Sequence, residues 1–140
     1  MKRRRRTEIL VQGDTSLAQM FAETITHNYE CQEIVAPQYG LTMIKMQESA
    51  KNSLFYIGEV LVTEAKVEIN QNIGIGIVKG MHEELARYLA IIDAAYKANL
   101  QETKEWSTQL IEAEKHFTKK KAKEQAELFK TKVNFETMDV

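Results

Sequence analysis

The chain has 140 residues, of which 44% are hydrophobic and 28% are charged. This length and composition fit one globular domain and exclude a chain that is disordered throughout. Cys31 is the single cysteine, so no disulfide can form within the chain, and a reducing compartment is expected. No apolar run approaches the roughly 18 residues that cross a membrane. The basic start is followed by too short an apolar run for a signal peptide, so we expect a cytoplasmic protein.

Charge is distributed unevenly along the sequence. Residues 2–6 are five consecutive cations, residues 7–100 carry 6 basic and 12 acidic side chains, and residues 101–140 carry 8 of each sign. A nucleic-acid-binding protein normally presents a basic face on its folded elements, so this acidic body is not expected to bind nucleic acid. The run from Lys2 to Arg6 is interpreted as a solvated end, the alternative being an arm that contacts phosphate groups.

The first part of the chain predicts helices followed by strands. A short helix is expected over 2–12, and apolar residues at helical spacing predict an amphipathic helix over 15–27. Residues 29–36 and 41–48 are predicted to be strands, separated by a turn that contains the only proline. A polar turn over 50–53 follows, so these elements suggest a meander of antiparallel strands.

Residues 54–69 form the most informative segment, because the side chains of a strand alternate between two faces. The odd positions from Phe55 to Ile69 are apolar almost throughout, whereas the even positions are apolar only as far as Val62. We therefore expect the first half of this strand to be covered on both faces and the second half to have one face in water. Gly58 is a candidate for a bulge or bend.

A turn over 70–72 leads into a strand over 73–79 and then a helix over 82–98. The three isoleucines of this strand share one face, and Gly74 and Gly76 share the other. A face without side chains lets a helix or another backbone approach closely. The helix carries an apolar stripe with alanines beside it, which is typical of a buried helix face.

The C-terminal part contains no glycine or proline and predicts a helix over 101–130, about 45 Å long at 1.5 Å per residue. Its apolar positions are sparse, so this helix either stands in solvent or packs on a partner. The tail over 131–140 carries Phe135 and Met138. It is predicted to dock on a partner, because chain ends are otherwise usually disordered.

Together these elements predict an α+β fold in a single domain over 1–140. An antiparallel sheet of about four strands is expected to be packed by the N-terminal helices and by the helix 82–98. A long C-terminal helix is added to this body. The domain is thus divided into N-terminal helices over 1–28, a sheet with its helix over 29–98, the extended helix over 101–130 and the docking tail.

No motif for catalysis or cofactor binding is recognisable. The glycines from Gly74 to Gly80 have the spacing GxGxxxG inside a strand, where ladder hydrogen bonds would occupy their amides, so a nucleotide loop is not favoured. His27, His82 and His116 have no second ligand at a spacing used by zinc sites. No GxSxG motif and no Ser-His-Asp arrangement is present. We predict no catalytic, cofactor-binding or metal-binding residue in this chain.

Four residues are candidates for interface or structural polar roles. Glu59 falls on the otherwise apolar face of the strand 54–69, and Asp93 lies within an apolar run of the following helix. A buried carboxylate must be paired or its pKa rises, so both are interpreted as structural, the alternative being contact with a partner or its substrate. Trp106 and Phe117 on the sparse helix are favoured as interface anchors over self-packing residues.

Two blocks of residues follow a familiar order. The first contains Gly58, Glu59, Thr63, Val67, the strand 73–80, Ala86 and the segment 90–94, and the second is the tail 132–138. Together they resemble the G subunit of the bacterial carbon–phosphorus lyase system, and length and element order fit over nearly the whole chain. The chain departs from the family at Arg87, where the family usually has an acidic residue. The lysine-rich helix 101–130 and the Arg3–Arg6 arm are also not family features.

The resemblance implies a cytoplasmic subunit of a hetero-oligomeric transferase in phosphonate metabolism and phosphorus assimilation. Its implied partners are the H, I and J subunits together with ABC-type subunits. The resemblance implies transfer of an alkylphosphonate to C1′ of the ATP ribose with release of adenine, giving ribose 1-methylphosphonate 5-triphosphate. ATP is then a substrate bound by partner subunits, and the iron–sulfur cluster and S-adenosylmethionine belong to the J subunit, which later breaks the C–P bond.

Two other hypotheses remain open at this stage. The chain could be a stand-alone α+β binding protein, with the helix 101–130 free or paired with a second copy. It could also be a small enzyme that uses Glu59 or Asp93 as an acid–base group. Copurification with the implied partners separates the first of these from the family hypothesis, and adenine release from ATP by the isolated chain would favour the second.

Overall fold

The computed structural model describes the backbone of residues 1–48 and 53–138, and the side chains of residues 1–43 and 58–130. It divides into two compact units. The smaller unit combines residues 1–14 with residues 105–140, and the larger unit spans residues 15–104. The expected single domain stays a prediction.

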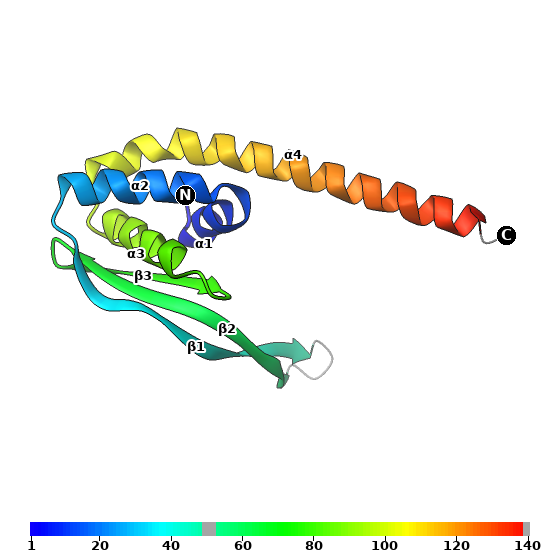
Figure 1. Ribbon diagram of the computed structural model, residues 1–140, viewed down its shortest axis with the longest axis horizontal. Coiled ribbons are helices and arrows are strands. Elements are labelled where there is room, and N and C mark those ends of the chain that lie inside the picture. The colour runs from blue at the N-terminus through cyan, green and yellow to red at the C-terminus, as the bar shows by residue number, and fades with distance from the viewer. Residues whose placement is uncertain (49–52, 139–140) are drawn as a thin grey trace. The chain divides into compact units, whose positions relative to one another are not determined.

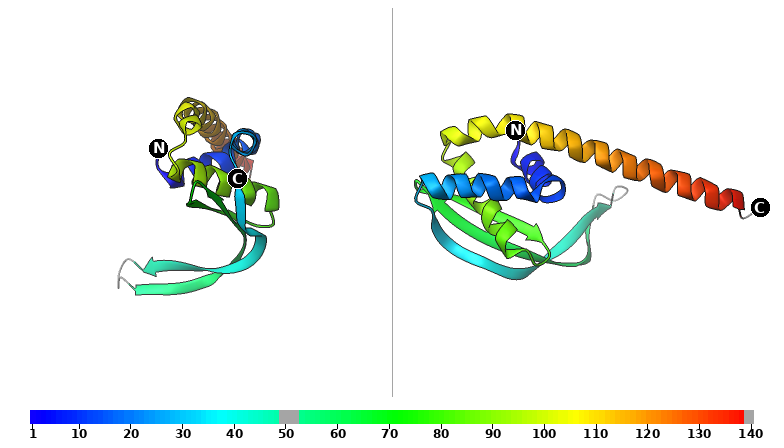
Figure 2. Two further views of the ribbon diagram at one scale, coloured as in Figure 1. Left: turned by 90° about the vertical axis from the view of Figure 1, so that its left-hand side faces the viewer. Right: turned by 45° about the horizontal axis from the view of Figure 1, so that its top comes forward.

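The larger unit is a layered α+β structure, which confirms the predicted fold class (Figure 1). Its antiparallel sheet has the strand order β1-β2-β3. Helix α3 packs on the sheet and helix α2 packs on α3 (Figures 1 and 2). The elements are α2 (Thr15–Asn28), β1 (Gln32–Glu48), β2 (Ser53–Ile69), β3 (Asn72–Lys79) and α3 (Glu83–Lys97).

The described part of the chain forms three strands, where about four were expected. The predicted strands 29–36 and 41–48 are one strand, β1, and Gly40 pairs within it with Val62. Pro37 lies in a β-bulge and not in a turn. Val35 pairs with Lys66 and Gln38 pairs with Glu64, so Ala36 and Pro37 on β1 stand opposite the single residue Ala65 on β2. A proline has no N–H to donate, and an edge strand tolerates it at such a bulge.

The glycine face of β3 carries helix α3, as predicted. Gly74 and Gly76 are buried. A Cβ atom added at Gly74 would lie 2.1 Å from the backbone nitrogen of Ala94, and one added at Gly76 would lie 2.1 Å from the carbonyl oxygen of Ala86. The helix backbone therefore rests directly on the strand, and only glycine fits at these two positions.

The second half of β2 follows the predicted alternation. Its odd positions from Thr63 to Ile69 are buried, and its even positions are only half-buried. The first half does not follow the prediction of cover on both faces, because Glu59 is exposed and Val60 and Leu61 are half-exposed. The reason is that β3 pairs with β2 only as far as Val62, so the β1–β2 hairpin runs on beyond it (Figure 1).

The core is built from small and branched apolar side chains. Ala65, Val67 and Ile69 of β2 are buried beneath the alanines and isoleucines of α3. The residues that α2 and α3 bury are Leu17, Ala18, Phe21, Ala22, Ile25, Ala86, Leu89, Ala90, Ile91, Ile92, Asp93, Ala94 and Ala95. Asp93 is the one charged residue in that set.

The smaller unit holds helices from both ends of the chain. Helix α1 (Arg3–Glu8) continues into a π-helical turn over Ile9–Gly13, and α4 (Gln101–Met138) contributes its length from residue 105 onward. Helix α4 runs past the expected end near residue 130, because nothing in the sequence terminates it there. The side chains of Phe135 and Met138 lie outside the described residues, so their docking role stays a prediction. No helix in the described ranges combines the length and apolar character needed to span a membrane.

Candidate functional site

Asp93 is a structural carboxylate that closes the outer edge of β3. It is buried on α3, and its Oδ2 atom accepts a hydrogen bond from the backbone N–H of Ile75 at 2.9 Å. Lys97, one helical turn later, lies 3.3 Å from Asp93 Oδ2 and donates to the carbonyl oxygen of Ile73 at 2.8 Å. Because β3 ends the sheet, these bonds satisfy backbone groups that would otherwise be open.

Thr63 joins β2 to the connection between β3 and α3. Its buried hydroxyl donates to the carbonyl oxygen of Gly80 at 2.6 Å and accepts from the backbone N–H of His82 at 3.1 Å. Gly80 has φ +88°, a backbone conformation that favours glycine. His82 therefore lies at the start of α3 in a structural connection. The sequence alone gave Thr63 no physical role beyond its place in a motif.

Glu59 lies in the projecting part of the β1–β2 hairpin. Its position in β2 pairs with Met43 of β1, and its side chain is exposed. The expectation of a buried, paired carboxylate is therefore wrong at this position, because β3 pairs with β2 only as far as Val62 and does not reach Glu59. An exposed carboxylate needs no neutralising partner within the chain.

The two aromatic candidates on α4 differ in their surroundings. Trp106 is 4% exposed, whereas an interface anchor would have to be accessible to a partner. Phe117 is half-buried beside Gly13, where an added Cβ atom would lie 3.3 Å from Phe117 Cβ, and the Lys121 ammonium is 5.8 Å from the centre of its ring. Among the described side chains of α4, the exposed large apolar residues are Ile111, which is 40% exposed, and further along Leu128 and Phe129.

The basic N-terminal segment forms a helix, in which the side chain of Arg5 is paired and that of Arg6 is buried. Arg5 donates two hydrogen bonds to Glu114 of α4, at 2.7 Å from Nε and 2.5 Å from Nη2. This bidentate contact lowers the pKa of the Glu114 carboxyl and raises the pKa of the Arg5 guanidinium. Arg6 is buried. The interpretation as a solvated end is therefore wrong for Arg6, whereas Arg5 is paired with Glu114 and remains exposed to solvent.

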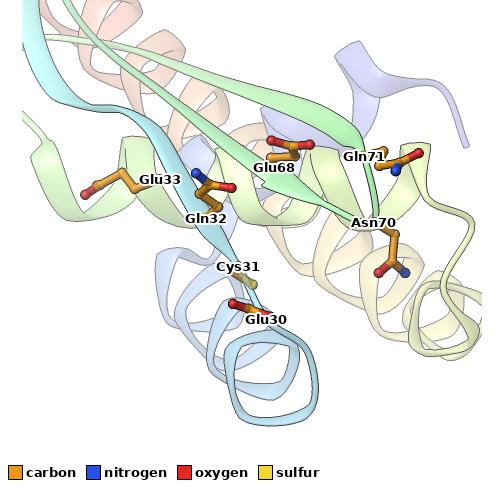
Figure 3. Close-up of a pocket in the computed structure, with 7 residues that line it drawn as sticks. All are labelled: Glu30, Cys31, Gln32, Glu33, Glu68, Asn70 and Gln71. Atoms are coloured by element: carbon orange, nitrogen blue, oxygen red, sulfur yellow. The ribbon is translucent and has the colours of Figure 1, made fainter.

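The larger unit has an acidic cleft of about 750 Å³, between the start of β1 and the turn that joins β2 to β3 (Figure 3). The carboxylates of Glu33 and Glu68 point to different sides of it, so they do not converge on one point (Figure 3). The cleft is lined by Glu30, Cys31, Gln32, Glu33, Glu68, Asn70 and Gln71. No cation is among these residues, so the cleft lining offers no positively charged side chain to a phosphonate or a triphosphate.

The Cys31 thiol in this cleft is not an activated nucleophile. Partial burial raises its pKa, so it stays protonated at neutral pH, whereas a reactive cysteine needs a lowered pKa. Within the ranges whose side chains are described, no group of three or more histidine, cysteine or carboxylate residues could hold a metal ion. The predicted lack of a metal site stays a prediction.

The sequence profile of one known family, described as the phosphonate metabolism protein PhnG, matches residues 1–139. The chain belongs to the PhnG family. The predicted resemblance to the G subunit of carbon–phosphorus lyase is thereby confirmed, and the chain takes part in phosphonate metabolism. No curated protein shows a significant match to the chain.

Several residues of the motif by which this PhnG chain resembles its family have structural roles in the larger unit. Gly74 and Gly76 make room for α3, and Thr63 and Asp93 bind backbone groups of the β3 region. Each of these residues maintains the fold and none lines the acidic cleft. Arg87, where this PhnG chain departs from the usual pattern, pairs with Glu33 and with Glu84, both at 3.2 Å.

Proposed function

We propose that this chain is an accessory, non-catalytic subunit of the carbon–phosphorus lyase core complex. In that role it supports transfer of an alkylphosphonate to C1′ of the ATP ribose with release of adenine, giving ribose 1-methylphosphonate 5-triphosphate. The H, I and J subunits and the ABC-type subunits are its proposed partners, and ATP, S-adenosylmethionine and the iron–sulfur cluster are held by them. The family match over residues 1–139 is the observation that carries the proposal.

The charge of the acidic cleft in the larger unit supports a role without substrate binding there. An alkylphosphonate and the triphosphate of ATP are anions, and proteins bind them with arginine, lysine or free backbone N–H groups. The acidic cleft offers carboxylates instead. Arg5 and Arg87 already form ion pairs with glutamates. The chemistry of the transfer is therefore best placed on a partner.

The exposed apolar surface supports a role inside an assembly. Leu128 is 70% exposed, and Phe129 beside it on α4 is similarly open. In the larger unit, Leu41 and Met43 are exposed on the projecting hairpin. Water-exposed apolar side chains of this size that gather on projecting elements are typical of surfaces that another protein covers.

The experiment reconstitutes the transfer reaction with and without this chain. The H and I subunits and the ABC-type subunits are mixed with ATP and methylphosphonate, and released adenine is measured by chromatography. Adenine should appear only when the chain is added, and the chain alone should release none. Full activity without the chain would contradict the accessory role, and adenine release by the isolated chain would show that it is itself an enzyme.

A further inference from the structure

We propose that the outer edge of β1 over residues 38–44 receives an extended strand of a partner protein, which adds to the sheet as a fourth strand. The incoming strand has apolar side chains at alternate positions and basic residues at its ends. The proposal deepens the proposed function, on which it rests, because it names the surface and the manner of docking. It is argued from the two edges of the sheet, the side chains on β1 and their charged neighbours.

The two edges of the sheet are treated differently by the fold. The edge of β3 is closed by Asp93, which accepts from Ile75 N–H, and by Lys97, which donates to the Ile73 carbonyl. In the described part of the chain, no strand pairs with the outer edge of β1. An open edge presents a row of unpaired N–H and C=O groups, and proteins normally protect such a row.

The outer edge of β1 is protected by bulges and a proline before residue 38, but not over residues 38–44. Bulges interrupt the pairing before Gln38 and again after Ile44, and Pro37 lies in the earlier one. Between them the pairing with β2 is regular from Gln38↔Glu64 to Ile44↔Gly58. This stretch contains no proline and no charged residue. A regular, uncharged and open edge is the template to which another strand adds.

The side chains along this edge form an apolar row. Tyr39, Leu41 and Met43 lie on one face of β1 because their positions alternate. Leu41 is 67% exposed and Met43 is 57% exposed, and Tyr39 is also exposed. Leu41 and Met43 lie beyond the last pair of β2 with β3, and Leu61 beside Leu41 on β2 is only half-buried. A strand with apolar residues at every second position would cover the row.

Acidic groups flank the row at both ends. Glu59 stands opposite Met43 in the pairing of β1 with β2 and is exposed. At the other end, the hydroxyl of Tyr39 donates to Glu83 Oε1 at 2.5 Å. The larger unit as a whole has 11 acidic and 7 basic residues. These charges favour an incoming strand that carries lysine or arginine at its ends.

The same charges disfavour a second copy of this chain as the occupant. An antiparallel pair of β1 strands centred on Leu41 would place Tyr39 of one copy opposite Met43 of the other. Glu59 of one copy and Glu83 of the other would then lie on one face, and like charges brought together lower the stability of an interface. The proposal therefore commits to a different protein as the source of the strand.

The first test uses the isolated chain and a synthetic probe. The probe is a seven-residue peptide of alternating valine and threonine with lysine at both ends, and binding is followed by backbone amide NMR and hydrogen exchange. Alternate amides between residues 38 and 44 should shift and become protected, whereas amides of β3 should not change. A peptide that ends in glutamate should bind several-fold more weakly. Absence of any effect over 38–44 at millimolar peptide would overturn the proposal, and so would a stable dimer of the free chain that buries this edge.

Substitutions separate the edge from other surfaces. L41K combined with M43K should weaken peptide binding at least about tenfold, because two exposed apolar side chains that the strand would cover are replaced by charges of the probe's sign. Met20→Lys on α2 is the matched control, since Met20 is also exposed but lies away from the sheet edge. Unchanged binding in the double variant, with circular dichroism showing an intact fold, would refute the role of this row.

The second test uses the assembled complex. The tagged chain, coexpressed with the H, I and J subunits, should capture them, and the double variant should lose most of this capture. Capture that is equal for the wild type and the double variant would overturn the strand-addition proposal and leave the accessory role intact. A wild-type chain that captures nothing would instead count against the proposed function, and the peptide test would still decide the proposal about the edge.

Discussion

Gly74 of β3 lies directly beneath Ala94 of α3, at a distance that leaves no room for a side chain. A Cβ atom added at Gly74 would be 2.1 Å from the Ala94 nitrogen and 2.7 Å from its Cα atom. Both neighbours are backbone atoms, so they cannot move aside as the end of a flexible side chain could. The separation of helix and sheet in the larger unit therefore depends on this glycine.

We expect Gly74→Ala to destabilise the chain by about 3 kcal/mol or more, because overpacking against backbone forces the helix off the strand. Gly40→Ala is the matched control, since a Cβ atom there meets nothing within 4 Å. That control should change the free energy of unfolding by less than about 0.5 kcal/mol. Urea unfolding followed by circular dichroism measures both. Equal stabilities for the two variants would show that α3 does not rest on β3 as described.

Asp93→Ala should destabilise the chain by about 1–3 kcal/mol, because the Ile75 N–H loses its acceptor and Lys97 loses its ion pair. Asp93→Asn keeps an acceptor oxygen, so its free energy of unfolding should fall by less than that of Asp93→Ala. Chemical denaturation compares the two variants, and hydrogen exchange at Ile75 should accelerate in the alanine variant only. If the asparagine variant were fully stable yet lost the activity of the reconstituted complex, Asp93 would have a chemical role after all.

The Arg5–Glu114 pair should respond to acid. Because its folded-state pKa is lowered, the ionised Glu114 carboxyl contributes stability above its ordinary pKa, and this contribution is lost as the pH falls through the lowered value. An NMR titration should therefore find the Glu114 midpoint below that of an ordinary glutamate. Arg5→Met should return the midpoint to the ordinary range, while Arg4→Met should leave it low. An unchanged midpoint in Arg5→Met would disprove the pairing.

A chain that stops after Lys121 should fold normally and lose partner capture. Every described side chain of α4 from residue 118 to residue 130 is exposed, including Leu128, so the deletion removes no core residue among those described. A deletion from residue 101 would also remove the buried Trp106 and Leu110, at a cost of several kcal/mol. Thermal unfolding and coexpression capture separate the two effects. Undiminished capture by the shorter chain would show that the end of α4 is not an interface.

Cys31 should react slowly with iodoacetamide at neutral pH. Burial raises its thiol pKa above the ordinary value of 9.0, so the reactive thiolate becomes abundant only at a higher pH than in free cysteine. The alkylation rate against pH, followed by mass spectrometry, should be displaced to higher pH relative to a cysteine-containing tripeptide. Cys31→Ser should leave the reconstituted transfer reaction unchanged, and a loss of activity there would reopen a chemical role for the cleft.

Local patterns in the sequence were enough for several features of the fold. The glycine face of β3 follows from alternation along a strand, which depends only on neighbouring residues. The apolar stripe of α3 follows in the same way from helical spacing. The resemblance of the two motif blocks to the carbon–phosphorus lyase G subunit was likewise readable from the order of residues, and the family match confirms it.

Features that depend on distant residues needed the tertiary structure. Pro37 signals a turn locally, and only the pairing of β1 with Glu64 and Lys66 makes it a bulge at a sheet edge. Arg5 and Glu114 are 109 positions apart, so no sequence window contains both. Glu59 sits in an apolar pattern, yet it is exposed because β3 ends before reaching it. The alternation of side chains predicts which residues share one face of a strand. The length of the neighbouring strands determines how much of that face is exposed to water.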